Sequence, residues 1–194
     1  MRIPSSQGHL EARLDRPAEP AGIAAVLCHP HPLYGGNLHD GVLDHVARAL
    51  LHRGVSCLRF NFRGVGASDG RFDGGGGETD DLMDAIAWLH ARETTRHLWL
   101  AGYSFGAHVV WQALGRGAEA DRVLLVAPPV GRMAFEVRRL ACPVDVFAGA
   151  ADEFIDQQTL AAWDGVNIHL LAGADHFFVG CGADLERRIE LAIG

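Results

Sequence analysis

Residues 102–106 of this chain read Gly-Tyr-Ser-Phe-Gly, a GxSxG pattern with the serine between two glycines. The apolar run His97–Ala101 precedes it, and a helical pattern from Phe105 to Leu114 follows it. On a tight turn from strand to helix, a serine hydroxyl lies above the sheet edge, and flanking glycines let neighbouring backbone approach closely. The pentapeptide is short and composed of common residues. The rest of the chain must therefore decide between a reactive Ser104 and a plain turn.

Length and composition indicate one α/β domain over residues 1–194. A chain of 194 residues is long enough to bury one sheet and too short for two comfortable domains. Its 48% hydrophobic and 21% charged residues exclude disordered and collagen-like classes. The formal net charge of -7, without a large cluster of basic residues, argues against nucleic acid as a partner.

The sequence also bears on location and cysteine chemistry. No run approaches the roughly 20 apolar residues that span a bilayer, and no charged-then-apolar leader begins the chain. We therefore expect a soluble, cytoplasmic protein with no membrane partner, while its oligomeric state stays open. Cys28, Cys57, Cys142 and Cys181 lack CxxC spacing, so we expect buried thiols.

Near-continuous apolar runs predict the strands of a mostly parallel sheet. Parallel strands covered by helices on both faces are expected to carry such runs instead of strict alternation. We expect about seven strands, with Gly8–Leu14 as an added edge strand. The other six are Ile23–Cys28, Val55–Phe60, Leu98–Ala101, Val123–Val126, Val144–Ala148 and Val166–Leu171.

Apolar residues recur at helical spacing between these runs, which predicts a doubly wound α/β sheet with helices on both faces. The Gly74–Gly77 run is expected to form a flexible loop, and Asp80 and Asp81 to open the next helix, where the helix dipole favours acids. The stripes are Leu43, Val46, Ala47, Leu50 and Leu51; Leu82, Ala85, Ile86 and Leu89; Val109, Val110 and Ala113; and Leu185, Ile189 and Ile193.

A reactive serine needs a base that accepts its proton and a carboxylate that orients the base. One known arrangement places them in the chain order serine, acid, histidine. Asp152 follows the predicted strand 144–148, and His176 follows the strand 166–171. Because parallel strands end at the same sheet edge, we predict that Ser104, Asp152 and His176 come together there.

Other residues compete for the same roles. Asp156 and Asp175 are rival acids, but Asp152 lies directly beyond a strand end and is favoured over both. His108 lies one turn into the helix after the serine, and His169 lies within a strand. We interpret both histidines as packed or surface residues.

The reaction would also need donors for a developing oxyanion. The backbone N–H of Phe105, directly after the serine, is expected to be one. The second is expected from the loop after the first core strand, where two prolines have no N–H. This leaves His31, Leu33 and Tyr34, among which the sequence does not choose.

The same loop invites a metal site, because Cys28, His29, His31 and His39 are all ligand types. Adjacent residues at a strand end tend to face opposite ways, and no acidic partner has convincing spacing. We therefore expect no metal and no cofactor. His29 is interpreted as a hydrogen-bonding residue that holds the loop, and His31 as one that shapes the pocket.

Taken together, four segments resemble the α/β-hydrolase superfamily, and within it small bacterial hydrolases without a lid. They are residues 29–36 (HPHPLYGG), 60–70 (FNFRGVGASDG), 102–106 (GYSFG) and 173–178 (GADHFF). Such proteins are similar in fold to dienelactone hydrolases and small carboxylesterases. The resemblance covers nearly the whole chain and implies a triad of Ser104, Asp152 and His176.

Two departures qualify what the resemblance implies. The loop reads HPHP where many members have HGG, which leaves the second oxyanion donor open. Dienelactone hydrolases proper use a cysteine nucleophile, and the serine here points toward ordinary ester chemistry. Arg63, in the glycine-rich segment, is interpreted as structural and expected to brace the loop that carries the acid.

Only Ala127–Pro143 is available where many esterases and lipases insert a cap. It leaves room for a loop and a short helix, so we expect no cap domain and an open site for small or flexible acyl groups. The expected activity is hydrolysis of small carboxylic esters through an acyl-enzyme. Thioester or amide cleavage, and a noncatalytic binding protein that keeps the fold, stay open as alternatives.

Overall fold

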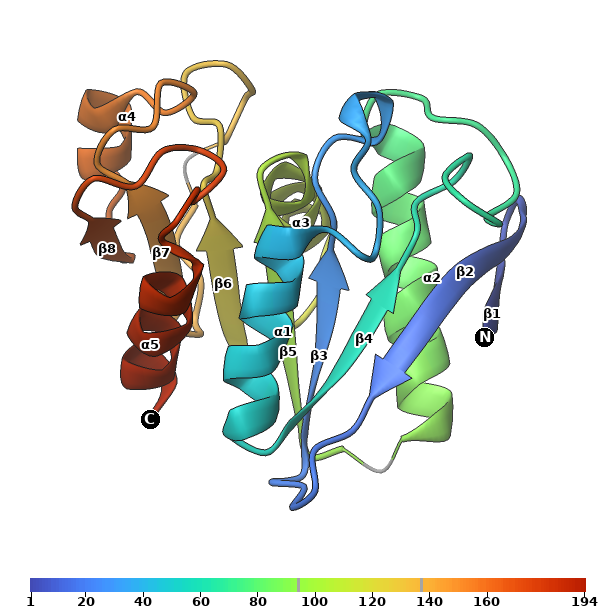
Figure 1. Cartoon of the computed structure of the whole chain (residues 1–194). Coiled ribbons are helices and arrows are strands. Elements are labelled where there is room, and N and C mark those ends of the chain that lie inside the picture. The colour runs from blue at the N-terminus through green and yellow to red at the C-terminus, as the bar shows by residue number, and fades with distance from the viewer. Residues whose placement is uncertain (94, 137) are drawn as a thin grey trace.

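A mostly parallel sheet of eight strands runs through the molecule in the order β1-β2-β4-β3-β5-β6-β7-β8 (Figure 1). The computed structural model describes residues 1–93, 95–136 and 138–194. The pairs β1–β2 and β2–β4 are antiparallel, and every other neighbouring pair is parallel. The strands are β1 (Arg2–Ser5), β2 (Gly8–Asp15), β3 (Ile23–Cys28), β4 (Val55–Phe60), β5 (His97–Tyr103), β6 (Arg122–Val126), β7 (Val144–Gly149) and β8 (Asn167–Leu171).

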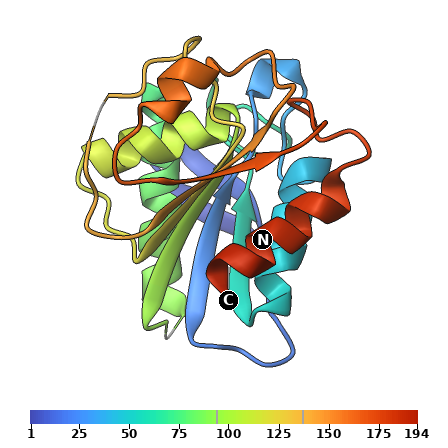
Figure 2. The ribbon, with the colours of Figure 1, turned by 90° about the vertical axis from the view of Figure 1, so that its left-hand side faces the viewer.

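Helices cover both faces of this sheet. Figure 2 shows α1 and α5 on one face and α2 and α3 on the other. Within the described ranges, no helix is both long and apolar enough to cross a membrane. The helices are η1 (Pro32–Tyr34), α1 (Gly41–His52), α2 (Gly76–Arg92), α3 (Phe105–Gly115), α4 (Gln157–Ala161) and α5 (Gly182–Ile193).

The predicted doubly wound sheet is confirmed, with one strand more than expected. Every residue of β4 and β7 is buried, as near-continuous apolar runs predict for strands between two helix layers. The segment predicted as an edge strand is β2, which lies one position inside the edge. The edge is β1, which the pattern missed because Ile3 is its one buried residue.

The start of α2 differs from the prediction. The helix begins at Gly76, so the last two glycines of the predicted loop are helical, and Asp80 lies in the second turn. The Glu78 carboxylate accepts the Gly75 N–H at 2.6 Å, and Asp73 accepts the Gly77 N–H at 2.8 Å. These two carboxylates satisfy N–H groups that a helix leaves free at its start, so a glycine run can open it.

Arg63 does not brace the acid loop, so that prediction is wrong. Its Nη2 atom donates to Asp81 Oδ1 at 2.8 Å, and its backbone N–H donates to Asp81 Oδ2 at the same distance. Burial raises the pKa of Asp81, and the hydrogen bonds from Arg63 oppose that rise. The pair thus ties the loop after β4 to α2, because a buried carboxylate needs a cationic partner.

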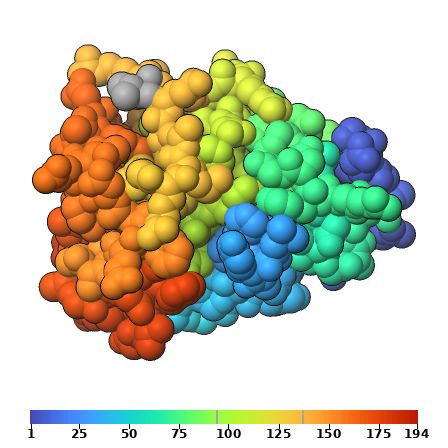
Figure 3. Space-filling view, turned by 90° about the horizontal axis from the view of Figure 1, so that it is seen from above, coloured from blue at the N-terminus to red at the C-terminus, as the bar shows by residue number. Residues whose placement is uncertain are grey.

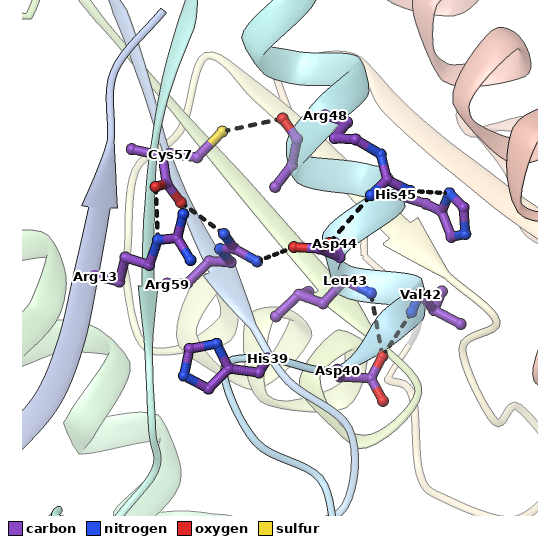
Figure 4. A network of polar contacts seen from close by, with 12 residues as sticks. Arg13, His39, Asp40, Val42, Leu43, Asp44, His45, Arg48, Cys57 and Arg59 are labelled. Carbon is purple, nitrogen blue, oxygen red and sulfur yellow. Dashed lines mark hydrogen bonds and ion pairs between the residues drawn. The ribbon is translucent and has the colours of Figure 1, made fainter.

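A second buried arginine joins β2, β4 and α1 (Figure 4). Arg59 donates to Asp15 and to Asp44, each at 2.6 Å, and Arg13 also donates to Asp15, at 2.7 Å. One guanidinium thus bridges an antiparallel strand and a helix on the sheet. This network holds α1, whose N-terminal end lies close to the loop that follows β3.

Two smaller features of the structure concern the cysteines and the segment before β7. Cys28 and Cys57 are buried as expected, but Cys142 and Cys181 are only half-buried. The described residues between 127 and 143 contain no helix, although the segment has room for a short one. The short helix in this half of the chain is α4, which lies between β7 and β8.

Candidate active site

Ser104 lies on a sharp turn between β5 and α3. Its backbone has φ 54° and ψ -116°, a region that residues other than glycine seldom occupy. A Cβ on Gly102 would lie 2.3 Å from the Gly106 carbonyl oxygen, and a Cβ on Gly106 would lie 2.2 Å from the Cys28 carbonyl oxygen. Only glycine fits at either position, so the GxSxG pattern follows from backbone packing around the serine.

Hydrogen bonds connect the three side chains that the sequence singled out. Ser104 Oγ lies 2.9 Å from His176 Nε2, and His176 Nδ1 lies 2.8 Å from Asp152 Oδ2. Because an ionised carboxylate only accepts hydrogen bonds, the proton is on Nδ1, and Nε2 is left to accept from the serine hydroxyl. Asp152 and His176 are 4% and 5% exposed, and Ser104 is half-buried. The arrangement can transfer a proton from serine to histidine.

Further contacts hold the acid and histidine loops. Asp152 Oδ1 accepts the Phe154 N–H at 2.8 Å, so both carboxylate oxygens are engaged. The hydroxyl of Tyr103, the residue before the serine, donates to the His176 carbonyl oxygen at 3.0 Å. Burial raises the pKa of Tyr103, so this hydroxyl keeps the proton that it donates. The histidine loop is therefore tied to the end of β5, and the acid loop is tied to the Asp152 carboxylate.

The rival residues have other partners. Asp156 caps α4 by accepting the Gln158 N–H at 3.0 Å, and its pKa is lowered by hydrogen bonds from Thr159 and Gln158. His108 Nε2 lies 2.7 Å from Gln112 Nε2, within the same helix.

His169 Nε2 lies 3.0 Å from Asp145 Oδ1, and its ring stacks on Phe147. Asp175 accepts backbone N–H groups of its own turn. Among the described hydrogen bonds, none of these four side chains contacts the Ser104 hydroxyl.

The loop after β3 narrows the choice of a second oxyanion donor. The Leu33 N–H donates to His31 Nδ1 at 3.2 Å, and the Tyr34 N–H donates to the His31 carbonyl oxygen at 3.1 Å. Leu33 and Tyr34 are thus engaged within η1 and its cap. The N–H groups of His31 and Phe105 have no acceptor among the residues that the structure describes. The rings of these two residues lie 5.0 Å apart, so the two free N–H groups belong to neighbouring residues.

His29 holds the loop, as the sequence indicated. Its Nδ1 lies 2.7 Å from the Pro30 carbonyl oxygen, and its Nε2 accepts the Phe62 N–H at 3.0 Å. Burial lowers the pKa of His29 to about 4, so the imidazole is neutral near pH 7. Both ring nitrogens are used, which joins the loop after β3 to the end of β4.

The metal-site alternative finds no support in the positions of its ligands. Cys28 lies buried at the end of β3, and both nitrogens of His29 are occupied as described above. In the parts of the chain that the structure describes, no three His, Cys, Asp or Glu side chains are placed to share a metal ion.

Sequence reasoning missed the aromatic surroundings of His176. The Phe154 ring stacks on the imidazole at 4.4 Å, and the Phe177 ring stands at 90° to it at 5.3 Å. The Arg132 guanidinium lies 4.8 Å from the centre of the Phe154 ring. Sequence position could have indicated them, because Phe177 directly follows His176 and Phe154 lies two residues after Asp152. Figure 3 shows the loops after β3, β7 and β8 gathered on one face.

The sheet order and the hydrogen-bonded serine, histidine and aspartate are those of an α/β serine hydrolase without a lid. The chain belongs to the X-Pro dipeptidyl-peptidase (S15) family of α/β hydrolases, whose model matches residues 8–131. That range contains Ser104 and ends before Asp152 and His176.

Several relatives match nearly the whole chain. A structure of an α/β serine hydrolase homologue from Coxiella burnetii is 32% identical with a TM-score of 0.94, covering 100% of this chain and 96% of that one. XC6422 from Xanthomonas campestris, a serine hydrolase without a lid, is 35% identical with a TM-score of 0.93, covering 100% and 92%. The uncharacterized protein RP471 of Rickettsia prowazekii (strain Madrid E) is 32% identical over 187 residues, which are 89% of this chain and 79% of that protein. These matches confirm the α/β-hydrolase fold and serine hydrolase chemistry.

Proposed function

We propose that this protein is a carboxylesterase that hydrolyses small carboxylic esters through an acyl-enzyme. The observation that carries the proposal is the hydrogen-bonded line from Ser104 through His176 to Asp152. It lies next to two backbone N–H groups that have no acceptor among the described residues. Acyl transfer requires a nucleophile, a base, an acid that orients the base, and donors for the oxyanion. The expected substrate is a small-molecule ester, and the described part of residues 127–143 forms no cap domain that would enclose it.

In the first half-reaction, His176 Nε2 takes the hydroxyl proton as Ser104 Oγ attacks the ester carbonyl carbon. The N–H groups of Phe105 and His31 hold the resulting oxyanion. The tetrahedral intermediate then collapses, the bond to the alcohol oxygen breaks, and His176 returns the proton to that oxygen. Asp152 stabilises the charged imidazolium throughout. Water repeats the cycle on the acyl-enzyme and releases the acid.

Amide cleavage is the second candidate, and one observation favours it. The matching family model is that of X-Pro dipeptidyl-peptidases, and peptide bonds are cleaved by the same acyl chemistry. Thioesters would also fit the mechanism. A panel of one acyl group on oxygen, sulfur and nitrogen leaving groups separates the three reactions, and fastest cleavage of the amide would replace the esterase proposal.

The decisive experiment is labelling with a fluorophosphonate, which modifies activated serines. We expect labelling and turnover of a short-chain ester by the wild type, and neither with Ser104→Ala. Ser68→Ala is the matched control, because this serine is buried away from the site and donates to the Asn61 carbonyl oxygen. Unchanged turnover by a folded Ser104→Ala variant would sink the proposal. Absence of labelling in the wild type would favour a noncatalytic binding protein.

A further inference from the structure

The turn at residues 175–179 presents two apolar side chains outward beside the histidine. Phe177 is 59% and Val179 is 74% exposed, whereas Phe178 between them is buried. The N–H groups of Phe177 and Val179 both donate to Asp175 Oδ1, each at 3.1 Å. Phe178 has φ 52°, which turns the chain between the two outward residues. The backbone of the turn therefore fixes their exposure.

Phe177 continues an apolar surface that begins at Phe154. The Phe154 and Phe177 rings meet at 6.2 Å and 79°, and both contact the imidazole of His176. We name Phe154 and Phe177 the aromatic wall. Isolated exposed apolar residues are common on proteins, but two exposed rings that both contact His176 indicate a binding surface.

Charged groups near the wall are already engaged. Arg132 lies over the Phe154 ring and donates to the Glu153 carbonyl oxygen at 3.2 Å. The Asp175 carboxylate accepts the two N–H groups of its own turn. The Arg132 cation lies over Phe154, so the part of the wall that offers apolar carbon and an uncovered ring is Phe177.

The mechanism decides which part of a substrate reaches this wall. His176 Nε2 must lie within hydrogen-bond reach of the leaving oxygen, since it returns the proton there. The carbonyl oxygen, in contrast, is held by the N–H groups of His31 and Phe105. The alcohol portion of an ester thus departs beside His176, where Phe154 and Phe177 flank the imidazole.

We propose that the aromatic wall binds the alcohol portion of the substrate, and that the preferred substrates are esters of apolar alcohols, above all those with a flat aromatic ring. This inference rests on the proposed esterase function. A ring stacked against Phe177 loses contact with water and gains an aromatic partner, which favours it over a polar chain of similar length.

The test compares benzyl acetate with 2-methoxyethyl acetate, which share the acyl group and differ in the apolarity of the alcohol. We expect the wild type to prefer the benzyl ester in kcat/KM. Phe177→Ser is expected to lower the ratio of benzyl to methoxyethyl turnover about fivefold to tenfold. Leu191→Ser is the control, because Leu191 is 73% exposed on α5, outside the wall. This control is expected to keep the wild-type ratio.

A binding measurement separates this inference from the proposed function. Benzyl acetate is titrated against Ser104→Ala and Ser104→Ala/Phe177→Ser by saturation-transfer NMR, which needs no turnover. Weaker ring binding by the double variant supports the wall even if the wild type cleaves no ester, an outcome that would break the esterase proposal alone. An unchanged benzyl preference in a Phe177→Ser enzyme that still cleaves esters overturns the wall. Equal losses for both esters would also overturn it, because Phe177 would then act through His176.

Discussion

The loop after β3 and the loop after β8 each place a buried histidine at the same edge of the sheet. His29 is 0% and His176 is 5% exposed, yet their ring nitrogens have different partners. Both nitrogens of His29 bond to backbone groups, whereas those of His176 bond to a serine hydroxyl and a carboxylate. The comparison teaches that burial does not separate a histidine that only holds the backbone from one placed to exchange a proton. What separates them is whether a partner can exchange a proton with the ring.

The largest effects on activity and stability should come from replacing each of the two histidines with alanine in separate variants. We expect His176→Ala to lower kcat roughly 10⁴- to 10⁶-fold, because the serine loses its base. His29→Ala is expected to lower the free energy of unfolding by about 2–3 kcal/mol, because the buried Phe62 N–H loses its acceptor and a cavity forms. Ester turnover and urea unfolding of both variants check this. A larger loss of kcat per folded molecule for His29→Ala than for His176→Ala would reverse the comparison.

The next effect concerns the backbone N–H that the His29 loop supplies. We expect His31→Pro to lower kcat about 10²- to 10³-fold, because proline has no N–H to hold the oxyanion. The φ of His31 is -58°, which proline adopts without strain. His31→Ala is the control, since it keeps the N–H and removes only the imidazole. Equal losses in the two variants would assign the effect to the ring or to loop distortion.

The pH dependence of the free energy of unfolding should further test the structural role of His29. The pKa of His29 is about 4 in the folded chain because of burial, against about 6.5 for an unfolded histidine. Above about pH 6.5, His29 is neutral in both the folded and the unfolded chain, so its titration does not change the free energy of unfolding. Below that pH the unfolded chain binds a proton first, so stability falls until about pH 4, by about 3 kcal/mol in all.

Urea unfolding of the wild type and His29→Gln at about pH 7.5, 5.5 and 4.5 isolates this contribution. Glutamine is neutral at each pH, so the variant should lose less stability on acidification than the wild type does. Parallel curves for the two proteins would show that another group causes the acid loss.

The smallest effect should come from the length of the acyl chain. Because the described part of the segment 127–143 forms no cap, carbons beyond a butyryl group would remain in water and add no binding energy. We expect acetyl and butyryl esters of one alcohol to be cleaved at least about threefold faster than the dodecanoyl ester. Faster cleavage of the long-chain ester would contradict an open site.

The fold was largely predictable because its signals are local. Near-continuous apolar runs marked six parallel strands, since a strand buried on both faces must be apolar at most positions. The edge strand β1 gave almost no signal, because it buries Ile3 alone. The start of α2 was misplaced for a similar reason: the carboxylates of Asp73 and Glu78 stabilise a glycine-rich first turn, and helix propensity does not register such contacts.

The meeting of Ser104, Asp152 and His176 was predictable from chain order, because parallel strands all end at one sheet edge. The roles of the loop residues were not. Leu33 and Tyr34 are equivalent to His31 in sequence reasoning, and only the hydrogen bonds around η1 show whose N–H is free. The partner of Arg63 was likewise misjudged, since Asp81 comes from a helix 18 positions later and reaches it only through the packing of α2 on the sheet.

The sequence by itself therefore determined the doubly wound sheet, the elbow around Ser104 and the order in which an acid and a histidine follow it. These depend on apolar periodicity and on glycines that admit close backbone, both of which are readable along one segment. Only the tertiary structure decided which N–H stays free, what Arg63 binds and which rings flank His176. Such contacts depend on where separate loops meet, and the free energy that selects them comes from burial and hydrogen bonding between segments far apart in the chain.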